Sequence, residues 1–320
     1  MRESQAIQRL RRIATSPAAL GLTDDTALFD GLVLTHDSIA EGIHFLPTDP
    51  AASVGWKLVT VNLSDLAAKG ATPAAALLSL ALSDDDAWDM GFLDGVEAAC
   101  ESYGLPLLGG DTIALPPGAP RVFGLTAIGR AGENVPLRSG ARAGDVLWVV
   151  GTLGDSAVGL ALLRDDSAAT GALVDVYRRP VPLLAAGQAL ASRAHAMMDV
   201  SDGLLIDAMR LAEASELNAE IDLDALPLSR AFVAERGSGL DSRLFAATGG
   251  DDYALLVALA PDADPLSLSL PSGTTIVRVG TLAAEGALLA LTSGGSPVPL
   301  PENLGHEHRS NSPAPVADRS

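Results

Sequence analysis

Aspartates recur in this chain where a strand or helix is expected to end or begin. The clearest groups are Asp24-Asp25, Gly109-Gly110-Asp111, Asp199-Val200-Ser201-Asp202-Gly203 and Gly249-Gly250-Asp251-Asp252. Carboxylate oxygens are hard ligands that suit Mg²⁺, and paired glycines let the backbone approach a phosphate closely. The pattern therefore indicates a site for a divalent cation and a phosphorylated ligand. Taken singly, each group also has a structural explanation, because Gly-Gly-Asp is a common turn and Ser201 or Asp202 could cap a helix.

The first group falls at the open end of an expected hairpin. Residues Thr26–Phe29 and Leu32–Thr35 read as two strands around Asp30-Gly31, a favoured two-residue turn. Continued pairing would place two facing pairs at the open end, Asp25 with His36 and Asp24 with Asp37. Like charges that face each other across strands are destabilising, and a bound cation would reverse that effect. The alternative is a solvated, frayed hairpin end.

Asp65 differs from the other aspartates because it falls inside a helical pattern. Helical spacing places it on one narrow stripe with small or apolar residues, namely Val54, Leu58, Val61 and Ala68. Because the opposite face is also apolar, the helix is expected to be buried all round. A buried carboxylate requires a partner or a metal. Two explanations stay open: an ion pair with Lys69 at i+4, or metal ligation.

The elements that would position these residues alternate between helices and strands. A helix is expected from Pro50, with Asp49 as its cap, to about Lys69, and another from Asp155. Further helices are expected at 83–102, Pro182–Arg193 and Leu204–Ser215. Strands are expected at Ala74–Leu82, Leu105–Leu108, Val122–Arg130, Val146–Val150, Ala219–Leu223, Tyr253–Ala260 and Thr275–Gly280. Since both halves mix strands and helices, the fold class is α/β or α+β, with a boundary between Arg130 and Ala143.

Composition excludes several classes of partner. The chain has 320 residues, 40 acidic against 21 basic, and a net charge of −19, so it repels nucleic acid. The longest apolar stretch, 74–82, is shorter than the ~20 residues that span a bilayer, so no membrane partner is expected. A single cysteine, Cys100, fits a reducing cytoplasm. Only two bases are lysines, Lys57 and Lys69, which genomic bias would explain.

Motifs of the common phosphate-binding and hydrolytic classes are missing from the sequence. There is no Gly-Lys dipeptide and hence no Walker A loop, no protein-kinase glycine-rich loop with a strand lysine, no Cys/His cluster for zinc, and no Gly-x-Ser-x-Gly elbow. Phosphate chemistry in this chain would therefore depend on carboxylates and a hard cation.

Taken in order, the motifs resemble the thiamine-monophosphate kinase family, of the superfamily that includes aminoimidazole ribonucleotide synthetase. The resemblance runs from about Gly21 to Gly280 and rests on eight segments: Gly21-Leu22-Thr23-Asp24-Asp25-Thr26-Ala27, Glu41-Gly42-Ile43-His44-Phe45, Val61-Asn62-Leu63-Ser64-Asp65-Leu66-Ala67-Ala68, Leu108-Gly109-Gly110-Asp111-Thr112, Arg138-Ser139-Gly140-Ala141, Gly151-Thr152-Leu153-Gly154-Asp155-Ser156, Asp199-Val200-Ser201-Asp202-Gly203-Leu204 and Gly249-Gly250-Asp251-Asp252-Tyr253.

The resemblance implies an activity and an architecture. The activity is ATP-dependent phosphorylation of thiamine monophosphate to thiamine diphosphate by direct in-line transfer, without a covalent nucleophile. The architecture is the two-domain aminoimidazole ribonucleotide synthetase-like fold. It implies an ATP- and magnesium-binding, dimerising domain at 1–137, an α/β domain at 138–306 and a disordered tail at 307–320. A cytoplasmic homodimer is implied, with ATP and thiamine monophosphate as its small-molecule partners.

The resemblance also assigns residues by position. Several Mg²⁺ ions would be held by Asp25, Thr35, His36, Asp37, Asp65, Asp111, Asp199 and Asp202. ATP would contact Tyr103, Gly110, Asp111, Arg138 and Ser201. The thiamine substrate would contact His44 and Asp251.

The chain departs from the family pattern at three places. The family usually has Thr or Lys at the position of His36, and often Glu-Asp-Tyr-Glu where this chain has Asp251-Asp252-Tyr253-Ala254. It commonly has a C-terminal aromatic, whereas Pro299–His308 contains no Trp, Tyr or Phe. Two alternatives stay open: another ATP-using enzyme of the same superfamily, or a non-catalytic metal- or nucleotide-binding paralogue. Selenophosphate synthetase fits less well, because no cysteine precedes Asp25.

Overall fold

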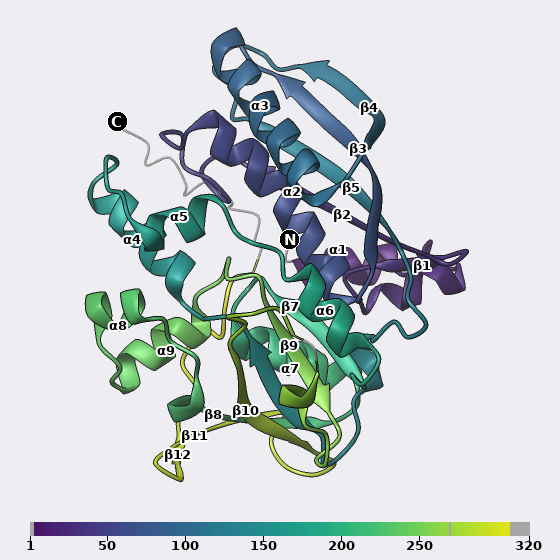
Figure 1. Ribbon diagram of the computed structural model, residues 1–320, viewed down its shortest axis with the longest axis vertical. Coiled ribbons are helices and arrows are strands. Elements are labelled where there is room, and N and C mark those ends of the chain that lie inside the picture. Colours follow the sequence, from purple (N-terminus) through teal and green to yellow (C-terminus); the bar gives the residue numbers. More distant parts are fainter. Residues whose placement is uncertain (1–2, 269, 308–320) are drawn as a thin grey trace, which may run out of the picture.

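The protein is described by a computed structural model that covers residues 3–268 and 270–307. Two halves lie one above the other along the long axis of the molecule, and each is built on its own sheet (Figure 1). The first half begins with α1 (Glu3–Leu10) and the short helix η1 (Pro17–Leu22). The predicted combination of strands and helices in both halves is confirmed.

In the first half, five strands form a mixed sheet in the order β1-β2-β5-β3-β4. β3 and β4 run parallel, and the other neighbours run antiparallel. Helices α2 (Ala51–Ala68) and α3 (Asp86–Tyr103) cover one face, where Leu58, Phe92 and Leu125 belong to a buried core. The strands are β1 (Ala27–Phe29), β2 (Leu32–Ala40), β3 (Thr72–Leu82), β4 (Leu107–Ala114) and β5 (Val122–Arg130).

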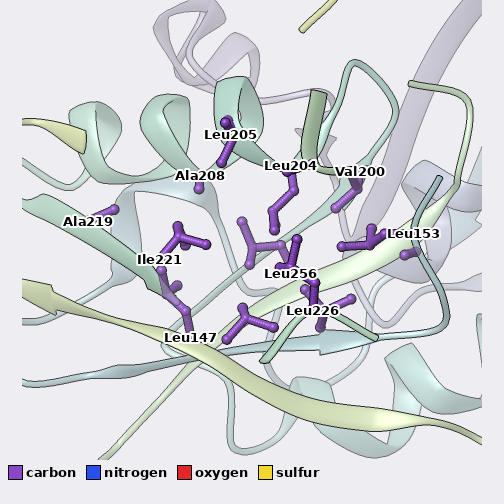
Figure 2. Packing of buried hydrophobic residues seen from close by; sticks show 14 of the residues in the cluster. Leu147, Leu153, Val200, Leu204, Leu205, Ala208, Ala219, Ile221, Leu226 and Leu256 are labelled. Atoms are coloured by element: carbon purple, nitrogen blue, oxygen red, sulfur yellow. The ribbon is translucent and has the colours of Figure 1, made fainter. Parts of the chain in front are cut away.

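In the second half, seven strands form a sheet in the order β12-β11-β8-β10-β6-β9-β7. Figure 2 shows Leu204 and Ala208 of α7 packing toward Ile221 and Leu256 of the sheet, within one buried cluster. The strands are β6 (Val146–Val150), β7 (Ala196–Val200), β8 (Asn218–Asp222), β9 (Ala254–Leu259), β10 (Ile276–Ala283), β11 (Leu289–Ser293) and β12 (Ser296–Val298). The helices are α4 (Asp155–Asp165), α5 (Ala172–Arg178), α6 (Leu184–Ala191), α7 (Leu204–Ala214), α8 (Arg230–Arg236) and α9 (Leu240–Thr248), with short turns η2 (Arg138–Gly140), η3 (Leu223–Ala225) and η4 (Pro265–Ser267).

Helix α2 lies between the two halves and is buried on nearly every side, as the sequence predicts. Its N-terminal part packs in the core of the first half, while Ala67 and Ala68 belong to a cluster with α6 and β7. The approach of α6 is close, because a Cβ on Gly187 would meet the Ala67 carbonyl oxygen at 2.0 Å. Residues of α2 therefore face both halves.

Three local predictions are wrong. Asp49 does not cap α2; its carboxylate accepts a hydrogen bond from the Leu46 N–H at 2.8 Å and pairs with Arg178 at 2.9 Å. The strand expected to end at Leu108 is β4, which continues through Gly109-Gly110-Asp111. The hairpin ladder stops at Ala27↔Leu34, because Asp24 and Asp25 turn away to pair with basic side chains.

Two expectations concern the ends of the chain and the membrane. Residues 308–320 of the expected tail lie outside the described residues. Among the residues described, no helix combines the length and apolar character needed to cross a bilayer.

Candidate active site

A cavity of about 910 Å³ opens between the two halves. The first half contributes residues from the segment before β1, from β2 and from the loop after it. The second half contributes the segments that follow β7 and precede β9. Seven residues assigned from the sequence line it: Asp25, Asp37, His44, Arg138, Ser201, Asp202 and Asp251. Segments more than 200 residues apart in the sequence thus share one cavity.

Three carboxylates meet beside this cavity, and of the three Asp25 lines it. Asp25, Asp65 and Asp199 each offer an oxygen, and these oxygens lie within 4.8 Å of one another. Asp65 comes from α2 and Asp199 from β7, and their residues are 6% and 3% exposed. Thr35 donates a hydrogen bond to Asp65, and Ser64 donates to Asp199 at 2.7 Å. The cluster therefore joins both sheets through α2.

The electrostatics of the cluster favour a bound cation. Burial, and then the neighbouring carboxylates, raise the pKa of Asp65 and of Asp199 well above the usual range. Asp25 Oδ2 is buried and has no hydrogen-bond partner among the described residues. A hard divalent cation takes oxygen ligands and offsets repulsion between carboxylates. The donor set present here, all oxygen, fits Mg²⁺.

Guanidinium and ammonium groups balance several carboxylates in and around the cluster. Arg138 forms an ion pair with Asp25, and Arg210 pairs with Asp202. Lys69 lies 2.8 Å from Asp24 Oδ1, so the i+4 pair with Asp65 considered from the sequence is wrong. Burial alone would raise the pKa of Asp24, but the charge and hydrogen bond of Lys69, together with the Arg138 N–H and charge, outweigh it and the pKa is lowered.

His44 and Asp251 line another part of the cavity, called here the His44–Asp251 end. The Ala40 N–H donates to His44 Nδ1 at 3.0 Å, so Nδ1 is an acceptor and any ring proton resides on Nε2. Asp251 forms an ion pair with Lys57 and accepts a hydrogen bond from the Tyr253 hydroxyl at 2.8 Å. The His44–Asp251 end therefore combines an imidazole and a carboxylate.

Four assigned residues lie away from the cavity. On β2 the side chain of His36 points opposite to Asp37, and its ring contacts Thr126 Oγ1 at 2.9 Å. Asp111 lies on edge strand β4 in a row with Ser79, Gly124 and Ser38, three strand spacings or roughly 14 Å from β2. Gly110 lies beside it, and Tyr103 packs against Trp56 in the first half. Within the described part of one copy, these four do not line the cavity.

Sequence reasoning missed several residues that hold the site together. The backbone N–H of Asp37 donates to Asn62 Oδ1 at 2.9 Å, and the Asp202 N–H donates to Asp207 Oδ2 at 3.1 Å. Arg210 bridges Asp202 and Asp207. A usable signal was the buried, polar Asn62 one helical turn before Asp65. The partners of Lys57, by contrast, are 13 and 194 residues away along the chain.

Comparisons with known proteins assign the family. The model described as AIR synthase related protein, N-terminal domain, matches residues 23–131, and the corresponding C-terminal domain matches 142–288. The thiamine-monophosphate kinase of Escherichia coli K12 is 36% identical over 304 residues, covering 90% of this chain and 91% of the relative. The chain belongs to the thiamine-monophosphate kinase family.

Two further relatives support this family assignment. The thiamine-monophosphate kinase of Caulobacter vibrioides is 38% identical over 275 residues, with 81% of this chain and 77% of that protein covered. A solved structure described as AaThiL complexed with AMPPCP and TMP has a TM-score of 0.81 and 31% identity, covering 95% and 97% of the two chains. The two-sheet architecture is thus that of the kinase family across nearly the whole chain.

Proposed function

We propose that this protein transfers the γ-phosphoryl group of ATP to the phosphate of thiamine monophosphate, which yields thiamine diphosphate and ADP. The observation that carries this proposal is one cavity lined by His44, Asp251 and Asp25, the last of which belongs to the buried carboxylate cluster with Asp65 and Asp199. A relative of matching fold is described as complexed with AMPPCP and TMP. We assign one ligand of each kind, a nucleotide and a thiamine phosphate, to this cavity.

The chemistry requires positioning and charge neutralisation more than a nucleophile on the protein. The acceptor is a phosphate whose oxygen is already anionic, so no strong general base is required. Mg²⁺ held by Asp25, Asp65 and Asp199, with Asp37 and Asp202 close by, would supply positive charge to donor and acceptor phosphates.

The chain's own groups indicate which end binds which substrate. Arg138 and Arg210 line one side of the cavity, and a guanidinium can donate two parallel hydrogen bonds to a phosphate. Beside them the lining is apolar, from Leu22, Ile206 and Met209, which suits a nucleobase. We place ATP there, with Ser201 near its phosphates, and thiamine monophosphate toward His44 and Asp251.

The C-terminal segment contributes a planar side chain to the cavity. His306 lines the cavity, and its backbone N–H donates to the Asp202 carbonyl oxygen at 2.8 Å. The neighbouring Gly305 lies against Ile206, since a Cβ there would meet an Ile206 methyl group at 2.4 Å. We therefore propose that the planar imidazole ring of His306 contributes to the nucleotide end.

We further propose that the functional unit is a homodimer joined through the first-half sheets. β4 is an edge strand along which every residue is exposed, and an open edge invites pairing with another chain. Leu108 and Ile113 on it are 67% and 56% exposed. Gly110 and Asp111 on β4 would then serve the site of a second copy, together with the predicted ligand His36 on the open face of the same sheet. Glycine at 110 also has a local reason, since a Cβ would meet the Leu78 carbonyl oxygen at 1.8 Å.

A mixing experiment tests the shared site. Asp65→Asn and Asp111→Asn homodimers are both expected to be inactive. If Asp111 serves the other copy, mixed dimers regain one intact site, about a quarter of wild-type activity after random exchange. No recovery in verified mixed dimers would place Asp111 outside the partner's site. We also propose that the boundary between the two domains lies at residue 137 and that the protein is cytoplasmic.

The kinase assignment is tested directly. Purified protein is incubated with ATP, Mg²⁺ and thiamine monophosphate, and thiamine diphosphate is followed by chromatography. Formation of ADP and thiamine diphosphate in equal amounts is expected, with unphosphorylated thiamine as the control acceptor. Absence of product across a range of Mg²⁺ concentrations would overturn the assignment and favour a non-catalytic paralogue.

A further inference from the structure

The two lysines of the chain are both enclosed at the boundary between the halves. Lys57 is 2% exposed and Lys69 is fully buried, and they are the only lysines in the sequence. Lysine is almost never fully buried without a partner, because an ammonium group loses its hydration there. Genomic bias would explain why lysine is rare in this chain, but it does not explain why both lysines are buried along α2.

Lys57 connects three segments at the His44–Asp251 end of the cavity. Its ammonium forms an ion pair with Asp251 and donates to the His44 carbonyl oxygen at 3.0 Å. It also lies 4.2 Å from the centre of the Tyr177 ring on α5. One cation thus links the loop after β2, the segment before β9 and the second-half helix α5.

Lys69 makes the corresponding contacts at the other end. Its ammonium lies 2.8 Å from Asp24 and donates to the carbonyl oxygens of Met197 at 3.0 Å and Pro136 at 3.3 Å. The second oxygen of Asp24 accepts the Arg138 N–H at 2.9 Å. The two lysines are 12 residues apart on or next to α2, about 18 Å along a helix axis.

The loop that carries Asp251 needs an external restraint. Asp251 has φ +70° and Tyr253 has φ +51°, values in the left-handed region that cost free energy for residues other than glycine. The Lys57 ion pair and the Tyr253 hydroxyl both hold the Asp251 carboxylate. Without the ammonium, the carboxylate loses the contact that ties it to the His44 loop.

We propose that Lys57 is the positioning residue for the acceptor substrate, and that Lys69 positions the Asp24–Arg138 segment at the nucleotide end. The inference deepens the proposed kinase function and rests on it. Lys57 acts through Asp251 and His44, because among the described residues it does not itself line the cavity. The two lysines therefore control the two substrates separately.

Paired methionine variants test this division. Methionine keeps an unbranched side chain of similar length but removes the charge. Lys57→Met is expected to raise the KM for thiamine monophosphate by about tenfold or more and leave the KM for ATP within about twofold. Lys69→Met is expected to show the opposite pattern. Equal shifts of both KM values in Lys57→Met, or a loss of kcat alone, would overturn the inference.

A double-variant comparison tests whether Lys57 acts through Asp251. If it does, Lys57→Met adds less than about twofold to the KM for thiamine monophosphate of Asp251→Asn. Multiplicative effects would instead assign Lys57 a separate task. Thermal unfolding checks that each variant is folded, and Lys57→Gln replaces Lys57→Met if the latter fails to fold.

Direct binding separates this inference from the kinase assignment. Thiamine monophosphate and AMPPCP are titrated into each protein with Mg²⁺ present, without turnover. Selective loss of thiamine monophosphate affinity in Lys57→Met supports the inference even if the wild-type protein forms no product. The absence of product would count against the kinase assignment alone. Unchanged affinity for both ligands in Lys57→Met would refute the positioning role.

Discussion

The Asp207 carboxylate should make the free protein less stable as pH rises. Asp207 is fully buried on α7, and burial, followed by the charge of Asp202, raises its pKa from 3.8 to about 7 although Arg210 opposes the shift. An acid whose pKa is higher in the folded state destabilises the fold once it ionises, so stability is lost between about pH 4 and pH 7. The shift corresponds to about 4 kcal/mol.

The perturbation that isolates this effect is Asp207→Asn. The amide oxygen can still accept the Asp202 N–H, but the side chain cannot ionise. Urea unfolding is measured at pH 5 and pH 8 in EDTA, without nucleotide. Part of the loss, about 1.7 kcal/mol, has already occurred at pH 5, so the difference in unfolding free energy, variant minus wild type, should rise by about 2.5 kcal/mol between the two pH values. Any destabilisation by the substitution that does not depend on pH contributes equally at pH 5 and pH 8, so it cancels when the two differences are compared.

Asp241→Asn, on an exposed turn of α9, controls for the loss of one negative charge. The reasoning is refuted if Asp207→Asn and wild type lose stability in parallel between pH 5 and pH 8. It is also refuted if the control shows the same rise as Asp207→Asn.

Further predictions concern the metal, the substrates and the dimer. Asp65→Asn should abolish turnover and the Mg²⁺-dependent rise in Tm while the fold persists; near-normal turnover would remove Asp65 from the cation site. Arg138→Ala should raise the KM for ATP by about tenfold or more, as expected for a lost charge-assisted contact of ~1.5–3 kcal/mol. An unchanged KM for ATP would show that ATP does not contact Arg138. Asp251→Asn should raise the KM for thiamine monophosphate more than that for ATP, and the reverse order would exchange the two ends. Ile113→Arg should yield monomers in light scattering with little activity, whereas an active dimer would exclude β4 from the interface.

Local pattern was sufficient for some parts of this structure. The stripe of Asp65 with Val54 and Leu58, together with an apolar opposite face, predicted a helix buried all round, because helical period and side-chain type are both read from neighbouring residues. The hairpin turn at Asp30-Gly31 followed from turn chemistry in the same way. Both features depend on contacts within a few residues.

Other parts depended on contacts between distant segments. The partner of Lys69 is Asp24, 45 residues away, rather than Asp65 one helical turn away. Arg138 reaches Asp25 across 113 residues. The sequence alone also did not settle that β4 would continue through Gly109-Gly110-Asp111, since parallel pairing with β3 decides it. Tertiary contacts therefore overrode the local alternatives.

The position of α2 limits how the enzyme can open and how it can unfold. Its side chains complete the core of the first half and also pack with α6 and β7 of the second. A hinge that swings the halves apart would expose both contacts, so such an opening would lose the burial of apolar surface on α2. A fragment ending near residue 137 would leave Ala67, Ala68 and both ammonium groups without their partners from the second half. The two halves should therefore unfold together in one cooperative transition, although the sequence divides them into two domains.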